Sequence, residues 1–102
     1  MFTNRALDGM SDYVKSVVGP VVFVANGTEH QVENLILETV AAGVVRVRFL
    51  IYPRKRCQVS EIRIYDIDGE LWMYKEENIS IDSADGKFYY MLKIDVEGKV
   101  FD

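Results

Sequence analysis

The first apolar residues of the chain recur at the spacing of an α-helix, in which positions three and four residues apart share one face. This stripe comprises Ala6, Leu7, Met10, Val14 and Val17. Thr3 or Asn4 can cap the helix start, because their side-chain oxygens accept hydrogen bonds from the first free N–H groups. Gly19-Pro20 predicts its end, since Gly permits a reversed backbone and Pro cannot extend a helix. The pattern predicts a helix over residues 4–18 that buries its apolar stripe.

From residue 20 to residue 97 the pattern changes to stretches in which apolar and polar positions alternate, the period of a β-strand. The alternation is clearest in residues 44–52 and 88–96. Turn residues separate the stretches, at Asn26-Gly27, Ala41–Gly43, Asp66–Gly69 and Asp85-Gly86. Residues 34–40 fit a strand or a helix, and the short flanking turns favour a strand. Residues 76–78 fit a polar turn or a charged edge strand.

Residues 59–74 carry the strongest short-range signal in the chain. Ile62 and Ile64 alternate with polar neighbours, Asp66–Gly69 supply turn residues, and Leu71–Tyr74 resume as a strand of large side chains. A strand, an Asp-Gly turn and a second strand predict a β-hairpin.

One helix followed by about six or seven strands predicts an α+β fold, with the N-terminal helix packed on a mostly antiparallel β-sheet or β-sandwich. A chain of 102 residues suits a single domain over residues 1–102. This length can bury a core without metals or disulfides, and the single Cys57 has no partner for an internal disulfide. No apolar run approaches the length of a membrane span, and no signal-like start is present, so we expect a soluble, unexported chain.

The charges are unevenly distributed. The formal net charge is −4, which disfavours generic binding to nucleic acid or membranes. Residues 46–63 nevertheless hold six cations against Glu61 alone: Arg46, Arg48, Arg54, Lys55, Arg56 and Arg63. With Tyr52 and Tyr65 nearby, this basic stretch allows an alternative function as a small nucleic-acid- or anion-binding β domain. A simpler interpretation is that the cations neutralise the acids at residues 66–85 or meet an acidic partner.

Candidate catalytic residues are few. His30 is the only histidine, and beside a hairpin turn it is expected to be an exposed polar residue. Cys57 follows three cations that can lower a thiol pKa, but a strand cysteine is more often a small buried hydrophobe. Asp66, Asp68 and Glu70 lack the spacing of a calcium-binding loop. We therefore expect no enzyme activity, no metal and no cofactor.

Two segments resemble parts of a known protein class. Residues 3–10, Thr-Asn-Arg-Ala-Leu-Asp-Gly-Met, are similar to the start of tail-collar fibre modules. Residues 59–72 look like their hairpin, in which an Ile-bearing strand leads into an Asp-x-Asp-Gly turn and a Leu. The chain thus resembles small tail-associated proteins of phages and prophages of Gram-positive bacteria. The resemblance implies a virion structural module, in the bacterial cytoplasm or in the virion, that binds other tail proteins and catalyses nothing.

Large side chains indicate where such a module could bind. Trp72, Tyr74, Tyr89 and Met91 fall on strands whose opposite faces can already fill a core. Aromatic residues and Met are enriched at protein interfaces. We therefore expect these four residues to bind a partner, and expect a homo-oligomer.

Overall fold

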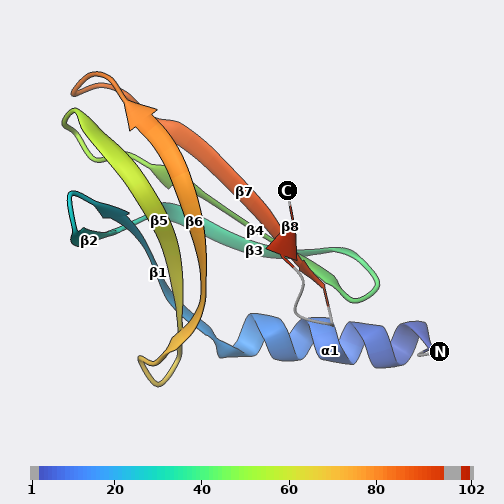
Figure 1. Ribbon diagram of the computed structural model, residues 1–102. Helices are drawn as coiled ribbons and strands as arrows, with labels where there is room; N and C mark the ends of the chain where they lie inside the picture. Colours follow the sequence, from blue (N-terminus) through green and yellow to red (C-terminus); the bar gives the residue numbers. More distant parts are fainter. Residues whose placement is uncertain (1–2, 96–99, 102) are drawn as a thin grey trace.

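The computed structural model describes residues 3–95 and 100–101, which form one helix and two antiparallel sheets (Figure 1). The helix is α1 (Asn4–Val17). Sheet A has the order β2-β1-β5-β6 and contains β1 (Val18–Ala25), β2 (Thr28–Gln31), β5 (Cys57–Asp66) and β6 (Leu71–Ile81). Sheet B has the order β3-β4-β7-β8 and contains β3 (Glu33–Ala41), β4 (Val44–Ile51), β7 (Phe88–Asp95) and the two-residue β8 (Val100–Phe101). The predicted α+β class is confirmed.

Helix α1 begins as predicted, because the Thr3 side chain accepts a hydrogen bond of 3.3 Å from the Ala6 N–H. Its end has a different cause from the one predicted. Val18 is already extended and starts β1, and Gly19 has no positive φ. Gly19 is needed instead because a Cβ there would lie 2.3 Å from the Asp66 carbonyl oxygen of β5. The close approach of two backbones, rather than a reversed backbone conformation at Gly19, explains why this position is a glycine.

The predicted strands are mostly confirmed. Asn26 and Gly27 both have positive φ, 53° and 76°, as a tight hairpin turn between β1 and β2 requires. Residues 28–40 belong to strands except at Val32, where the chain passes from β2 of sheet A to β3 of sheet B. β6 runs unbroken through residues 76–78 at the edge of sheet A, so the turn interpretation of that stretch is wrong. β7 ends at Asp95, and the predicted strand residues 96–97 lie outside the described residues.

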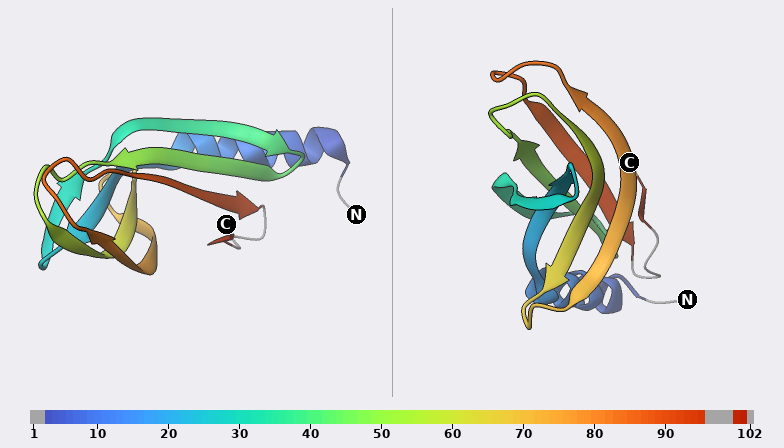
Figure 2. Two further views of the ribbon diagram at one scale, coloured as in Figure 1. Left: turned by 90° about the horizontal axis from the view of Figure 1, so that it is seen from above. Right: turned by 60° about the vertical axis from the view of Figure 1, so that its left-hand side comes forward.

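The core lies between the two sheets, where the inward residues of the alternating strands meet. Its fully buried members include Phe23, Val47, Ile51, Ile62, Ile64 and Leu92. Helix α1 contacts β3 and β4, and seen from above it lies behind these strands (Figure 2). The predicted stripe of α1 is half-buried. The helix and sheet A lie on the same side of sheet B, so the outer face of sheet B is the opposite side (Figure 2).

Candidate interaction surface

The outer face of sheet B carries large side chains that the core does not use. The strand register places Leu50 beside Tyr89, and Arg48 between Met91 and Ile36. Tyr89 is 80% exposed, and Ile36 and Met91 are each 41% exposed. We call Ile36, Leu50, Tyr89 and Met91 the sheet B patch, in which Leu50 is only 9% exposed. They line a hollow of about 320 Å³ together with Asn34 and Arg48.

A β-bulge contributes to this hollow. Glu33 pairs with Leu50 and Ile36 pairs with Arg48, so β3 holds one more residue than β4 between these pairs. Asn34 takes up the difference with a positive φ of 56°, and bulges of this kind bend a strand locally. A second hollow of about 340 Å³ shares Tyr89 and Met91 with the first and continues to β6. The apolar surface therefore extends over one edge of sheet B.

One side of the sheet B patch is bordered by cations. Arg46 Nε lies 2.7 Å and Arg48 Nε 2.9 Å from the same Glu38 carboxylate oxygen. The hydrogen bond from Arg46 is the main cause that lowers the pKa of Glu38. Two guanidinium groups around one carboxylate leave this triad with a net charge of +1.

The four predicted partner-binding residues lie in three places. Tyr89 and Met91 belong to the sheet B patch. Tyr74 is exposed on the outer face of sheet A, opposite Arg63 of β5. Trp72 is the extra residue of a bulge in β6, and it lines a hollow of about 190 Å³ with Met73, Ile94 and Val100. The alternation that grouped Trp72 with Tyr74 is broken at this bulge.

The outer face of sheet A differs, because polar side chains accompany its apolar residues. Val22 and Val24 are each only 6% exposed, and their neighbours across the strands include Arg63, Glu61 and Glu29. Arg63 contacts Glu61 at 2.6 Å and Glu29 at 2.8 Å, which raises the pKa of Arg63. The Tyr65 hydroxyl donates to Glu29, and this bond, more than Arg63, lowers the pKa of the Glu29 carboxyl.

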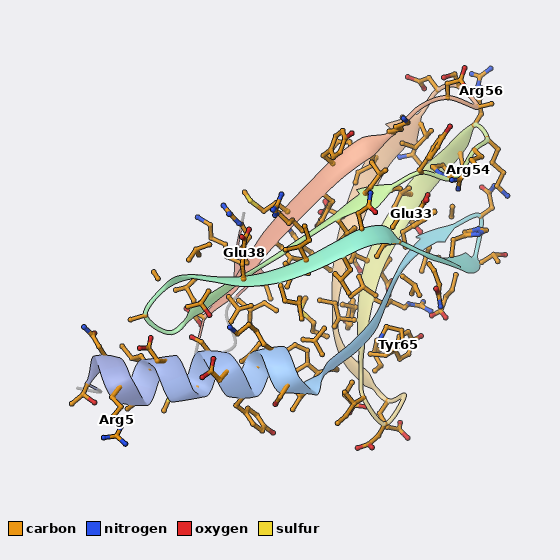
Figure 3. All side chains as sticks on the ribbon, turned by 180° about the vertical axis from the view of Figure 1, so that it is seen from behind. Arg5, Glu33, Glu38, Arg54, Arg56 and Tyr65 are labelled. Carbon is orange, nitrogen blue, oxygen red and sulfur yellow. The ribbon has the colours of Figure 1, made fainter. Side chains whose placement is uncertain are left out.

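The predicted basic stretch is divided among three parts of the surface: the outer face of sheet A with Arg63, the outer face of sheet B, and the loop after β4. Arg46 and Arg48 bind Glu38 of β3, whereas Arg54 binds Glu33 at 3.1 Å and lies 4.3 Å from the centre of the Tyr52 ring. Figure 3 shows Glu38 well separated from Arg54 and Arg56.

The acids that pair with these cations come from residues 29–61, so the expectation that residues 66–85 neutralise them is wrong. Lys55 and Arg56 are exposed and form no ion pair within the described part of the chain.

The two candidate nucleophilic or acid–base residues lie on different strands, His30 on β2 and Cys57 on β5. His30 is half-buried rather than exposed as predicted, and its ring stacks on Phe23 at a centroid distance of 5.2 Å. Burial raises the pKa of the Cys57 thiol, which makes it a poorer nucleophile near neutral pH. Over residues 3–95 and 100–101 there is no group of three or more His, Cys, Asp or Glu side chains that could hold a metal ion. No helix within these residues is long and apolar enough to cross a membrane.

Sequence reasoning missed Ile36, Leu50 and Asn34. Leu50 could have been found, because it follows Arg46 and Arg48 on the outward positions of one strand. Ile36 could not, because the bulge before it decides which way it points. Comparison with protein-family models, curated proteins and solved structures found no match for this chain.

Proposed function

We propose that this protein is a non-enzymatic assembly module that binds another protein through the sheet B patch. The observation that carries the proposal is the exposure of Ile36, Tyr89 and Met91 around one hollow, although a complete core lies on the opposite face of the same sheet. Clustered exposed apolar side chains of this kind mark interaction sites, and Tyr, Met and Arg are enriched where proteins meet. The neighbouring Arg48 adds a charged group at the border of the contact.

The resemblance of residues 3–10 and 59–72 to tail-collar fibre modules supports a partner within a phage tail. On this proposal the module is a structural component of a virion or prophage, where it joins neighbouring tail proteins. The genes on either side of its own gene would bear on this part of the proposal: tail and capsid genes would support it, and metabolic genes would remove its support.

A photo-crosslinking phenylalanine analogue tests the surface directly when it replaces Tyr89 in the cells that make the protein. The expected result is one discrete crosslinked species, identified by mass spectrometry. The control places the same analogue at Tyr13 on α1, which is also highly exposed at 66% but lies away from the patch. An absence of adducts at position 89, or equal diffuse adducts at both positions, would contradict the proposed function.

A further inference from the structure

A second exposed apolar element lies at the turn between β5 and β6. Residues 66–71, which we call the β5–β6 tip, read Asp-Ile-Asp-Gly-Glu-Leu. Ile67 is 66% exposed and Leu71 is 50% exposed. The tip therefore presents two aliphatic side chains next to three acidic ones.

The β5–β6 tip is held in one conformation. The Asp66 carboxylate accepts hydrogen bonds from the N–H groups of Asp68 at 2.9 Å and Glu70 at 3.0 Å. The Ile67 N–H donates to the Val17 carbonyl at 3.0 Å, which ties the tip to the end of α1. A preorganised element loses little conformational entropy when it binds. The tip is thus suited to act as a rigid knob.

The β5–β6 tip and the sheet B patch have complementary chemistry. The tip carries Asp66, Asp68 and Glu70 and no cation. The hollow of the sheet B patch is apolar and is bordered by Arg48, whose triad with Arg46 and Glu38 carries a net charge of +1. Opposite charges at the border of an apolar contact set its register and exclude wrong partners.

The two elements point away from each other. The turn between β5 and β6 is at the lower end of the molecule in Figure 1, whereas the view from above in Figure 2 looks onto the face of sheet B opposite to the helix. A tip cannot reach the hollow of its own chain in this arrangement. Because the tip and the hollow face in opposite directions, two chains cannot exchange both contacts reciprocally, so the contact is heterologous and produces rings or filaments rather than closed dimers.

We propose that the partner at the sheet B patch is a second copy of this chain, whose β5–β6 tip inserts Ile67 into the hollow so that copies join head to tail. This inference rests on the proposed function and specifies its partner. Ile67 fills the space between Ile36, Leu50 and Met91, and the acids of the tip face Arg48. Each copy offers one tip and one hollow, so the assembly continues beyond two chains.

Two variants separate the two halves of the contact. Ile67→Lys removes the apolar knob and places a cation against the border, whereas Met91→Glu places an acid in the hollow, where it repels the tip. Tyr13→Lys is the matched control, because Tyr13 is as exposed as Ile67 but lies on neither element. Circular dichroism verifies that each variant keeps its fold.

Sedimentation velocity over a range of concentrations measures the assembly. We expect the wild type and Tyr13→Lys to form species larger than two chains, and each interface variant to associate at least about tenfold more weakly. An equimolar mixture of Ile67→Lys and Met91→Glu should regain an association that neither variant shows alone, because the first variant keeps its hollow and the second keeps its tip.

Three results would overturn the inference: a wild type that stays monomeric at high micromolar concentration, a wild type that stops at two chains, or a variant mixture that stays monomeric. A monomeric wild type together with a discrete adduct of a different protein at position 89 would leave the proposed function standing. The absence of any adduct at position 89 would instead contradict the proposed function itself.

Discussion

Glu38 and Glu29 each connect two strands of one sheet, Glu38 on the outer face of sheet B and Glu29 on the outer face of sheet A. Glu38 of β3 binds Arg46 and Arg48 of β4, and Glu29 of β2 binds Arg63 and Tyr65 of β5, two strands away. Side-chain hydrogen bonds to these carboxylates favour their charged form and lower the pKa of both. All of these groups are partly exposed, so solvent screens the contribution that each pair makes to stability.

The lowered pKa values predict how stability depends on acid pH. A folded-state pKa below the ordinary value of 4.5 means that the unfolded chain binds more protons in this range. The contribution of Glu29 and Glu38 to the free energy of unfolding is therefore complete above pH 4.5, and it is lost as the pH falls through the lowered values. Urea unfolding at pH 7 and pH 3 measures the change. Between these pH values the free energy of unfolding should fall less for the double variant Glu29→Gln, Glu38→Gln than for the wild type.

Salt provides the control for this comparison. About 1 M NaCl reduces the Debye length to about 3 Å. At this salt concentration the wild type and the double variant should lose more similar amounts of stability between pH 7 and pH 3. An identical pH-dependent loss in both proteins at low salt would show that these carboxylates make no such contribution.

At the scale of single residues, alternation predicts exposure only where the strand is regular. It correctly placed Tyr89 and Met91 opposite the buried Tyr90 and Leu92 of β7. Trp72 is exposed at 37%, as the alternation predicts, but the bulge opposite Tyr65 shifts the register of β6 by one residue, so Leu71 on the opposite face of the regular pattern is exposed too. His30 shows a related limit, since stacking on Phe23 depends on which residues face each other across β1 and β2.

At the scale of elements, the junction between α1 and β1 is fixed by its contact with the end of β5. Val18 pairs with Asp66, and the Ile67 N–H reaches the Val17 carbonyl. Gly19 lies where the two backbones are closest, with 2.3 Å between its virtual Cβ and the Asp66 carbonyl oxygen. The helix and the β5–β6 tip are therefore positioned by the same few residues.

This junction predicts opposite effects for two glycine substitutions. Gly19→Ala forces the backbones apart and should lower the free energy of unfolding by about 1–3 kcal/mol. Gly9→Ala is the matched control. Gly9 lies within α1, a Cβ there would meet nothing within 4 Å beyond the backbone of its own helix, and Ala favours a helix by about 0.5–1 kcal/mol. Urea unfolding of both variants measures the two changes. A stability of Gly19→Ala equal to that of the wild type would show that the junction can adjust at no cost.

Local patterns were sufficient for the helix and for the β5–β6 hairpin, because both depend on residues close in sequence. The assignment of strands to two sheets was not predictable, since it depends on pairings such as β1 with β5 that join distant segments. The break at Val32 carries no turn residue, yet it moves the chain from one sheet to the other. Residues 76–78 could not be assigned for the same reason: only the pairing with β5 shows that β6 continues.

At the scale of the whole molecule, the same long-range pairing decides where the chemistry lies. The sheet B patch combines residues from β3, β4 and β7, which no local pattern groups together. The basic stretch of residues 46–63, continuous in sequence, is instead divided between the outer faces of both sheets and the loop after β4. Carboxylates of Glu29, Glu33, Glu38 and Glu61 bind four of its six cations.

This distribution bears on the alternative function, binding of nucleic acid or another anion. A nucleic-acid platform gains affinity when cations displace counterions from phosphates, and cations already paired with carboxylates are less able to do so. We therefore expect no binding to single- or double-stranded DNA tighter than roughly micromolar at physiological salt, the range of non-specific contacts. Fluorescence anisotropy with labelled oligonucleotides at two salt concentrations measures this.

The loop after β4 allows the strictest form of that test. Lys55 and Arg56 are exposed there, and Arg54 is bound to Glu33. The variant Glu33→Gln therefore releases Arg54 from its ion pair and leaves the number of cations in the loop unchanged. If carboxylate pairing is what prevents binding, Glu33→Gln should bind DNA more tightly than the wild type, and the gain should disappear as salt rises. If the wild type already binds tightly and in a salt-dependent way, and Arg54→Ser with Arg56→Ser abolishes the binding, then the alternative function is correct and the assembly proposal loses its priority.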